Sequence, residues 1–93
     1  MKNKPRIEFA PLFTKQRKTA SVEIKEAFLD TLELFLEDPT NLFLRNHPLQ
    51  GKFAGFRSID VTDDLRAVFK EVQTAERTVI TFHMLGAHKE LYG

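Results

Sequence analysis

Hydrophobic side chains recur every three or four residues between positions 21 and 38, which is the spacing of a helix with one buried face. The stripe consists of Ile24, Phe28, Leu32 and Phe35, and Leu29 and Leu36 widen it. Ser21 is placed to cap the start of this helix, and the pair Asp38-Pro39 ends it. Acidic side chains at positions 23, 26, 30, 33 and 37 follow the same spacing and indicate a face exposed to solvent.

The residues before this helix predict a short strand and a first helix. Positions 6–9 alternate between polar and apolar side chains, as in a strand. Pro11 suits the first turn of a helix that runs to about Lys18. Few residues separate the two helices, so we expect them to form a helical hairpin.

After a loop at positions 39–52, three alternating runs predict an antiparallel sheet. The runs cover positions 53–61, 65–72 and 77–85, separated by gaps of three and four residues. Gaps this short join neighbouring antiparallel strands. A brief turn at 89–92 ends the chain. The sequence therefore predicts one α+β domain over residues 1–93, with the element order β-α-α-β-β-β.

The lengths of the two gaps predict the strand register. The first gap places Asp60 opposite Arg66, and the second places Arg66 opposite His83, Ala67 opposite Phe82, Phe69 opposite Ile80 and Val72 opposite Arg77. One face of the sheet is then apolar and meets the helices through Ile59, Val61, Leu65, Ala67, Phe69, Ile80, Phe82 and Met84. The other face carries Asp60, Arg66 and His83 in one row.

An Asp–Arg–His row suits chemistry on a phosphate. Arginine offers a forked donor, the carboxylate orients it, and histidine titrates near neutral pH. The alternative is a surface ion pair, worth about 0–1 kcal/mol, with a histidine beside it that does nothing. The pattern alone leaves both interpretations open.

Composition narrows the possible classes of protein. The chain has no Cys, which excludes disulfides, thiolate nucleophiles and Cys-ligated zinc, and its nine Phe predict a core built on phenylalanine. The three His lack the spacing of metal ligands, so no metal or cofactor is expected. No apolar run reaches the roughly 18 residues of a membrane span, and no apolar signal segment follows Met1, so we expect a cytoplasmic protein.

Charge is unevenly placed along the chain, although the net charge is only +1. Residues 1–20 carry six basic and one acidic side chain, whereas residues 21–38 carry one basic and six acidic side chains. This pattern is not that of a general nucleic-acid binder, so any contact with RNA depends on the local placement of charge.

Three segments of the C-terminal half carry a family resemblance. Residues 47–57 read HPLQGKFAGFR and resemble the HPLxGxWxGYR stretch of YafQ-type toxins. Residues 65–70 read LRAVFK, similar to the YRLVY strand of RelE-type toxins, and residues 85–92 read LGAHKELY, similar to the TGTHxxLF ending of YafQ relatives. The segments occur in the family's order, and the predicted helices fit its β-α-α-β-β-β plan.

The resemblance implies a type II toxin of the RelE superfamily. Such toxins cut mRNA in the ribosomal A site, and a cognate antitoxin silences them. The implied cleavage needs no metal: the ribose 2′-hydroxyl attacks the next phosphate and leaves a cyclic phosphate. The implied partners are the antitoxin, the ribosome and mRNA, with no membrane and no direct contact with DNA.

Carried over residue by residue, the resemblance implies roles for individual side chains. His88 is the implied general acid or base, and His47 shares that work or binds the phosphate. Arg66 is implied to stabilise charge on the scissile phosphate, and Asp64 matches an acidic residue that precedes the family's strand. Each has a structural alternative, such as ordering a loop or a turn. Contacts with RNA are expected at Lys52, Arg57, Lys70 and Tyr92.

Two positions depart from the family's pattern. Asp60 stands where YafQ relatives have a His, and His83 has no counterpart. The two residues either form a relocated acid–base pair around Arg66 or signal weaker activity. Two other functions therefore stay open: a ParE-like toxin that binds DNA gyrase without cutting RNA, and a degenerate module that only pairs with an antitoxin.

Overall fold

The computed structural model describes residues 4–92, apart from the side chains of Glu90 and Tyr92. Five strands form one mixed sheet in the order β1-β5-β4-β3-β2. The strands are β1 (Arg6–Phe9), β2 (His47–Pro48), β3 (Arg57–Asp60), β4 (Leu65–Gln73) and β5 (Thr78–Ala87). The helices are α1 (Pro11–Thr19), α2 (Val22–Glu37) and α3 (His88–Tyr92), and two 3-10 turns are η1 (Leu42–Leu44) and η2 (Gly51–Phe53).

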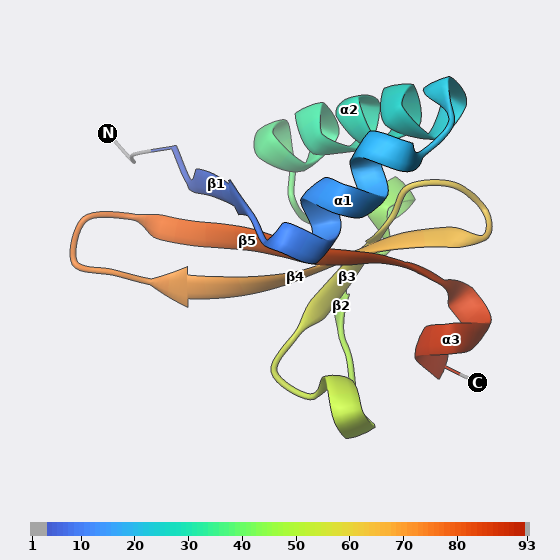
Figure 1. Ribbon diagram of the computed structural model, residues 1–93. Coiled ribbons are helices and arrows are strands. Elements are labelled where there is room, and N and C mark those ends of the chain that lie inside the picture. Colours follow the sequence, from blue (N-terminus) through green and yellow to red (C-terminus); the bar gives the residue numbers. More distant parts are fainter. Residues whose placement is uncertain (1–3, 93) are drawn as a thin grey trace.

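The two long helices lie on one side of the sheet, and η2 and α3 lie on the other (Figure 1). The expected α+β class and the β-α-α-β-β-β order are confirmed. The expected meander is the centre of a wider sheet, because β1 adds parallel to β5 and β2 adds antiparallel to β3. None of the described helices is long and apolar enough to cross a membrane.

Both long helices begin where the sequence predicts. Pro11 occupies the first turn of α1, and the Ser21 hydroxyl accepts a hydrogen bond from the Ile24 amide at 3.2 Å at the start of α2. The expectation that Leu29 and Leu36 widen the buried stripe is wrong, because both are half exposed. The helix rests on its line of Phe28, Thr31 and Phe35, and positions one residue further on turn about 100° away from the sheet.

Phenylalanines form the core between helices and sheet, as the composition predicts. Phe82 lies at the centre, with ring centroids 5.3 Å from Phe28, 5.6 Å from Phe13 and 5.6 Å from Phe69. All four are at most 1% exposed. Burying aromatic side chains in such contacts is a large stabilising contribution, with roughly 0.5–1.5 kcal/mol per ring pair beyond the area buried.

A second apolar cluster lies on the opposite face of the sheet. Leu49, Val68 and Leu91 are buried there, and Phe53, Phe56 and Met84 pack against them. The sequence pattern predicts a mainly polar surface on this face. The cluster instead fixes α3 and the segment around η2 to the sheet, which matters because α3 begins at His88.

The expected register of β3 with β4 is confirmed, but that of β4 with β5 is wrong. Asp60 faces Arg66, whereas Val72 faces Val79 and Phe69 faces Phe82. The cause is that the four-residue turn lies one residue later than expected, at positions 74–77, where the Thr74 hydroxyl donates to the Arg77 carbonyl at 2.7 Å and Gln73 pairs with Thr78.

A β-bulge shifts the register further. Phe69 faces Phe82 and Val68 faces Met84, so His83 is the extra residue on β5. Beyond the bulge Ala67 faces Leu85 and Arg66 faces Gly86, not Phe82 and His83 as expected. The bulge also reverses the alternation, so Leu85 joins the core beneath the helices and Met84 joins the opposite cluster, contrary to the expectation.

Candidate functional site

The centre of the candidate site is the ion pair of Asp60 and Arg66. The two residues end β3 and begin β4, directly opposite one another, and the Asp60 backbone carbonyl accepts a hydrogen bond of 3.4 Å from Thr31 on α2. Asp60 Oδ1 lies 3.0 Å from Arg66 Nη1. Arg66 is only 3% exposed and the Asp60 side chain 16%, so solvent screens this pair little.

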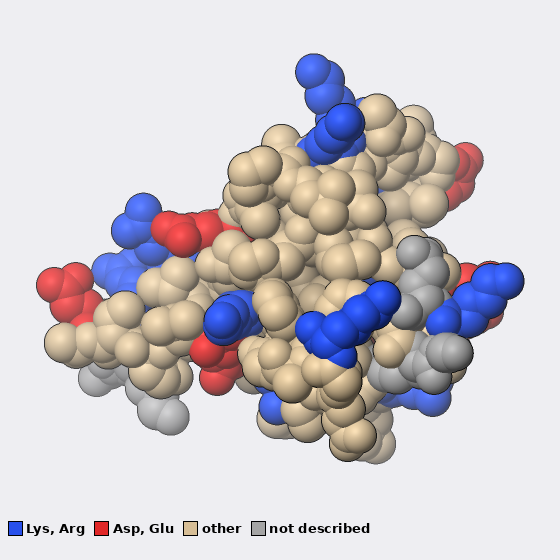
Figure 2. All heavy atoms as spheres, turned by 60° about the horizontal axis from the view of Figure 1, so that its bottom comes forward, with Lys and Arg blue, Asp and Glu red and all other residues tan. Residues whose placement is uncertain are grey.

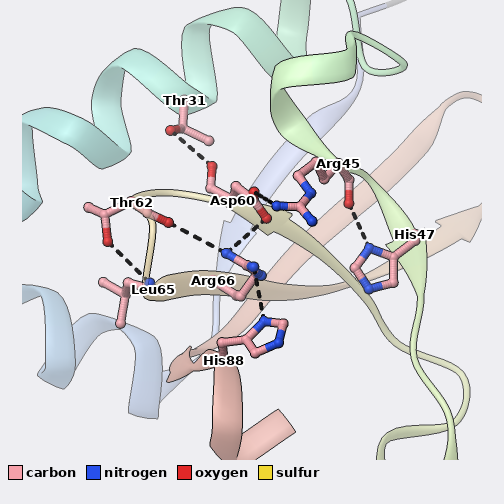
Figure 3. A network of polar contacts seen from close by, with 8 residues as sticks. All are labelled: Thr31, Arg45, His47, Asp60, Thr62, Leu65, Arg66 and His88. Atoms are coloured by element: carbon pink, nitrogen blue, oxygen red, sulfur yellow. Dashed lines mark hydrogen bonds and ion pairs between the residues drawn. The ribbon is translucent and has the colours of Figure 1, made fainter. Parts of the chain in front are cut away.

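His88 completes this group from the start of α3. Its backbone amide donates to the Asp64 carbonyl at 2.9 Å, which ties the end of β5 to the β3–β4 turn. Its Nδ1 lies 3.0 Å from Nη2 of Arg66, as Figure 3 shows. A guanidinium can only donate, so Nδ1 is the acceptor and the ring carries its proton on Nε2. The site thus holds His88 as a neutral N–H donor.

The hydrogen bond of His47 favours the opposite tautomer to that of His88. Its Nδ1 lies 2.6 Å from the backbone carbonyl of Arg45, and a carbonyl can only accept, so Nδ1 carries the proton. In the neutral ring, Nε2 is then a lone-pair acceptor, and the backbone of Arg45 fixes this tautomer. His47 faces Ser58 across β2 and β3, and directly opposed side chains share a face, so His47 lies on the same face as Arg66.

Arg45 is a member of the site that the sequence did not indicate. Its Nη1 lies 3.7 Å from Asp60 Oδ2, so Asp60 lies between two arginines (Figure 3). Its backbone is left-handed, with φ 49°, a conformation that costs a non-glycine residue energy and that concentrates at functional positions. A local sequence pattern carries no signal for this contact, because residues 45 and 60 meet only through the fold.

The Arg66 guanidinium is incompletely hydrogen bonded. Its bond to the Thr62 carbonyl is long at 3.4 Å, and its Nε has no hydrogen-bond partner among residues 4–92 as described. Asp60 Oδ1 contacts it as an ion pair without the angles of a hydrogen bond. Buried donors without partners are costly, so a structural role alone accounts poorly for Arg66.

Other predicted site residues lie away from this centre. His83 packs edge-on against Phe56 with ring centroids 5.1 Å apart, so it is not a neighbour of Arg66 across the ladder. Lys70 Nζ lies 5.5 Å from the Phe56 ring, and Lys52 Nζ lies 5.3 Å from the Phe53 ring. Arg57 Nε donates to Asn46 Oδ1 at 2.9 Å.

Asp64 contacts the other residues of the candidate site only through its backbone carbonyl, which accepts from the His88 amide. Its carboxylate makes no hydrogen bond or ion pair with any residue that the structure describes, and it borders a hollow of about 270 Å³ with Ala87, His88 and Lys89. The side chain of Tyr92 lies outside the described part of the chain. The structure thus brings together Asp60, Asp64, Arg66 and His88, with His47 joined to them through Arg45.

Basic side chains form no single continuous patch on the face that Figure 2 turns toward the viewer, and acidic side chains lie on the same face. Among the described residues, no group of three or more His, Asp or Glu is arranged to hold a metal ion. The chemistry that the site offers is therefore a donor imidazole, an acceptor imidazole and arginines held by a carboxylate.

Solved toxin structures share this fold. The YafQ structure from E. coli strain BL21(DE3) is 24% identical, with 96% of this chain and 99% of that chain covered and a TM-score of 0.72. YafQ in the E. coli DinJ-YafQ complex is 27% identical, with 96% and 99% covered and a TM-score of 0.62. A YoeB/ParE toxin from Agrobacterium tumefaciens is 15% identical, with 89% and 98% covered and a TM-score of 0.72.

The fold and the order of its elements are therefore those of a RelE-like toxin. The likeness to the RelE/YafQ-like toxin superfamily that the motifs predicted is supported by YafQ structures that are 26% and 27% identical to this chain. No family model matches the sequence, and no curated protein matches it at a significant level. The likeness to YafQ and YoeB structures supports a toxin of the type II class.

Proposed function

We propose that this chain is a type II toxin that cuts mRNA on the ribosome by acid–base chemistry without a metal ion. The observation that carries the proposal is the bridge of Arg66 between Asp60 and His88, in a chain with the YafQ-like fold. A buried arginine held by a carboxylate fixes the imidazole of His88 in one orientation. Such fixed groups are what catalysis of phosphate chemistry needs.

The hydrogen-bond partners of the two histidines support a different role for each of them in this proposal. His47 Nε2 takes the proton of the ribose 2′-hydroxyl, and the 2′-oxygen attacks the adjacent phosphorus. The bond from phosphorus to the 5′-oxygen breaks while His88 Nε2–H donates a hydrogen bond to that oxygen, which takes its proton from water. The products are a 2′,3′-cyclic phosphate and a 5′-hydroxyl end, and His47 passes the proton it has taken to the solvent, so both imidazoles regain their starting forms.

Arg66 acts in this proposal as a positioning residue. At 3% exposure its guanidinium has almost no surface to offer a phosphate, so direct contact would require it to leave its present place. From that place it donates to His88 Nδ1 and keeps the proton on Nε2, where the leaving oxygen needs it. Asp60 keeps the charged guanidinium in place beneath the site.

The partners that we propose are an antitoxin, the ribosome and mRNA. The neighbours include E. coli YafQ in complex with DinJ, so we propose a cognate antitoxin that covers the site of this toxin. With a net charge of +1 and scattered basic side chains, the chain alone has weak electrostatic attraction for free RNA. We therefore propose that the translating ribosome presents the mRNA, which places the toxin in the cytoplasm.

The test is induced expression followed by mapping of the 5′ ends of a translated reporter mRNA. The wild-type chain should arrest growth and produce cuts in frame with translation, and a matched mRNA without a start codon should stay intact. His88→Ala should abolish the cuts. His83→Ala is the matched control, because His83 is a histidine of the preceding strand β5 that contacts Phe56 instead of Arg66.

A second candidate function is a module that binds an antitoxin but cuts nothing. The observation that favours it is the scatter of basic side chains together with the burial of Arg66. This candidate predicts no growth arrest and no cuts, with antitoxin binding intact. Growth arrest with DNA damage and uncut mRNA would instead indicate a ParE-like toxin.

A further inference from the structure

The segment from η1 to Arg45 presents two exposed side chains, Phe43 and Arg45, that concern the candidate site. Leu44 is buried and anchors the segment, whereas Phe43 is 84% exposed. The segment is fixed at its start, where Asn41 Oδ1 accepts from the Phe43 amide at 2.9 Å, and at its end, where the Arg45 amide donates to the Leu42 carbonyl at 3.2 Å. An exposed phenylalanine is therefore held on a structured turn.

Phe43 lines a hollow that Asp60 also lines, and its neighbour Leu42 does not. A hollow of about 300 Å³ between α2, η1 and the β3–β4 turn is lined by Phe43, Leu34, Asp60 and Thr62, among others. Leu42 is more exposed than Phe43, at 89%, but is absent from this lining. Asp60 belongs to both the hollow and the ion pair with Arg66, so the hollow adjoins the proposed catalytic residues.

Arg45 is the accessible cation of the site. Its side chain is 68% exposed, against 4% for Arg66, and its contact with Asp60 is 3.7 Å long. An exposed ion pair of this kind is weak, so the guanidinium can exchange the carboxylate for a ligand phosphate at little cost. A planar forked donor is well suited to that ligand.

The rim of the hollow indicates which part of a nucleotide enters it. Asp30 and Asp63 also line it, and neither forms an ion pair within the described part of the chain. Their charges repel a phosphate but not the uncharged ring of a base. Carboxylates also accept hydrogen bonds from the amino groups of bases.

We propose that Phe43 and Arg45 form a nucleotide subsite, in which a base of the mRNA beside the scissile bond stacks on Phe43 and its phosphate pairs with Arg45. Exposed aromatic side chains bind unstacked RNA bases in this way. The subsite rests on the proposed endoribonuclease function. It assigns the recognition of the message to a turn outside the three motif segments.

The test uses ribosomes programmed with an mRNA that carries 2-aminopurine in the codon to be cut and 2′-O-methyl groups that block cleavage. Stacking on an aromatic ring quenches this fluorophore, so wild type and Phe43→Tyr should quench it, whereas Phe43→Ala and Phe43→Leu should not. On unmodified mRNA, Phe43→Ala should lower cleavage about 10-fold or more, mainly through KM. Leu42→Ala is the matched control and should behave as wild type.

A second pair of variants tests Arg45. Arg45→Gln should weaken binding of the 2′-O-methyl mRNA about 10-fold and reduce the salt dependence of binding by one phosphate contact. Arg6→Gln is the control, because Arg6 is 64% exposed and pairs with Glu8 at 3.1 Å on the opposite edge of the sheet. Thermal unfolding of each variant checks that the fold is retained.

The outcomes separate this proposal from the function it rests on. If the wild type cuts and Phe43→Ala quenches and cuts equally well, the subsite is wrong and the endoribonuclease stands. If Phe43→Ala and Leu42→Ala both weaken antitoxin binding and leave cleavage unchanged, the segment is a protein-docking surface and the subsite is again wrong. If the wild type itself cuts nothing, the proposed function fails and the subsite fails with it.

Discussion

Arg66 faces Gly86 across β4 and β5, and this pairing brings His88, two residues further on, to 3.0 Å from the guanidinium. A glycine opposite Arg66 leaves room for the side chains of Leu91, on α3, and of Met84. The β-bulge at His83 creates the pairing, because a regular ladder continued from Phe69 and Phe82 would place Leu85 opposite Arg66. The chemistry of the candidate site thus depends on one extra residue in β5.

The assignment of His88 as the hydrogen-bond donor to the leaving oxygen predicts rescue by a better leaving group. His88→Asn keeps a side-chain oxygen able to accept from Arg66 but loses the Nε2 proton, so cleavage should fall about 10²–10³-fold. An RNA with sulfur in place of the bridging 5′-oxygen needs no such donor. On that substrate His88→Asn should cut at nearly the wild-type rate, whereas His47→Asn should stay slow. Equal rescue of the two variants would contradict the assignment.

The burial of Arg66 predicts that Asp60 contributes to stability. Asp60→Ala leaves a guanidinium that is 3% exposed without its nearest carboxylate, and should lower the free energy of unfolding by about 3 kcal/mol in urea denaturation. Glu8→Ala, which removes the exposed pair with Arg6, should cost less than about 1 kcal/mol.

A double variant separates loss of the pair from loss of packing at Asp60. Asp60→Ala combined with Arg66→Met removes both charges, so it should be more stable than Asp60→Ala alone. If the double variant is instead as unstable as the sum of the two single variants, the ion pair is not the cause.

Local patterns in the sequence were sufficient for most of the fold. Ser21, Pro11 and the apolar stripe of α2 define both helices, because caps and periodicity act over a few residues. The short gap after β3 also predicts the pairing of Asp60 with Arg66, since one face of that hairpin must be apolar.

The contacts that the sequence did not predict are those that form between distant residues. The bulge at His83 has no local signal, because Met84 and Leu85 are both apolar and either of them could continue the buried face of the strand. The contacts of Arg45 with Asp60 and of His88 with Arg66 join residues 15 and 22 positions apart, and only the tertiary fold brings them together. The family motifs pointed to His88 and Arg66 as members of one site, without giving the contact between Arg66 Nη2 and His88 Nδ1.

Gly86 should tolerate alanine but not valine. A Cβ at this position would lie 3.3 Å from Leu91 Cδ2 and 3.3 Å from Met84 Cε, which are ends of flexible side chains that can move slightly. The branched side chain of valine would push Leu91 and with it α3, so His88 would lose its contact with Arg66. Gly86→Ala should therefore retain cleavage, and Gly86→Val should lose most of it while the far-ultraviolet circular dichroism spectrum stays native. Equal activities of the two variants would show that α3 need not be held at this point.

The bulge predicts unequal effects of two single-residue deletions in β5. Without His83, Met84 follows Phe82 directly, and the pairs of Val68 with Met84 and of Arg66 with Gly86 both persist in a regular ladder. Removing Ala87 keeps the same pairs but draws His88 one position, about 3.3 Å, toward the strand and away from Arg66.

The variant without His83 should thus remain an active endoribonuclease in the reporter assay, with some loss of stability because the ring contact with Phe56 is gone. The variant without Ala87 should be as inactive as His88→Ala. Hydrogen exchange of the Phe69 and Phe82 amides would check that the ladder survives in both variants. Active protein after removal of Ala87 would mean that His88 does not need its place beside Arg66.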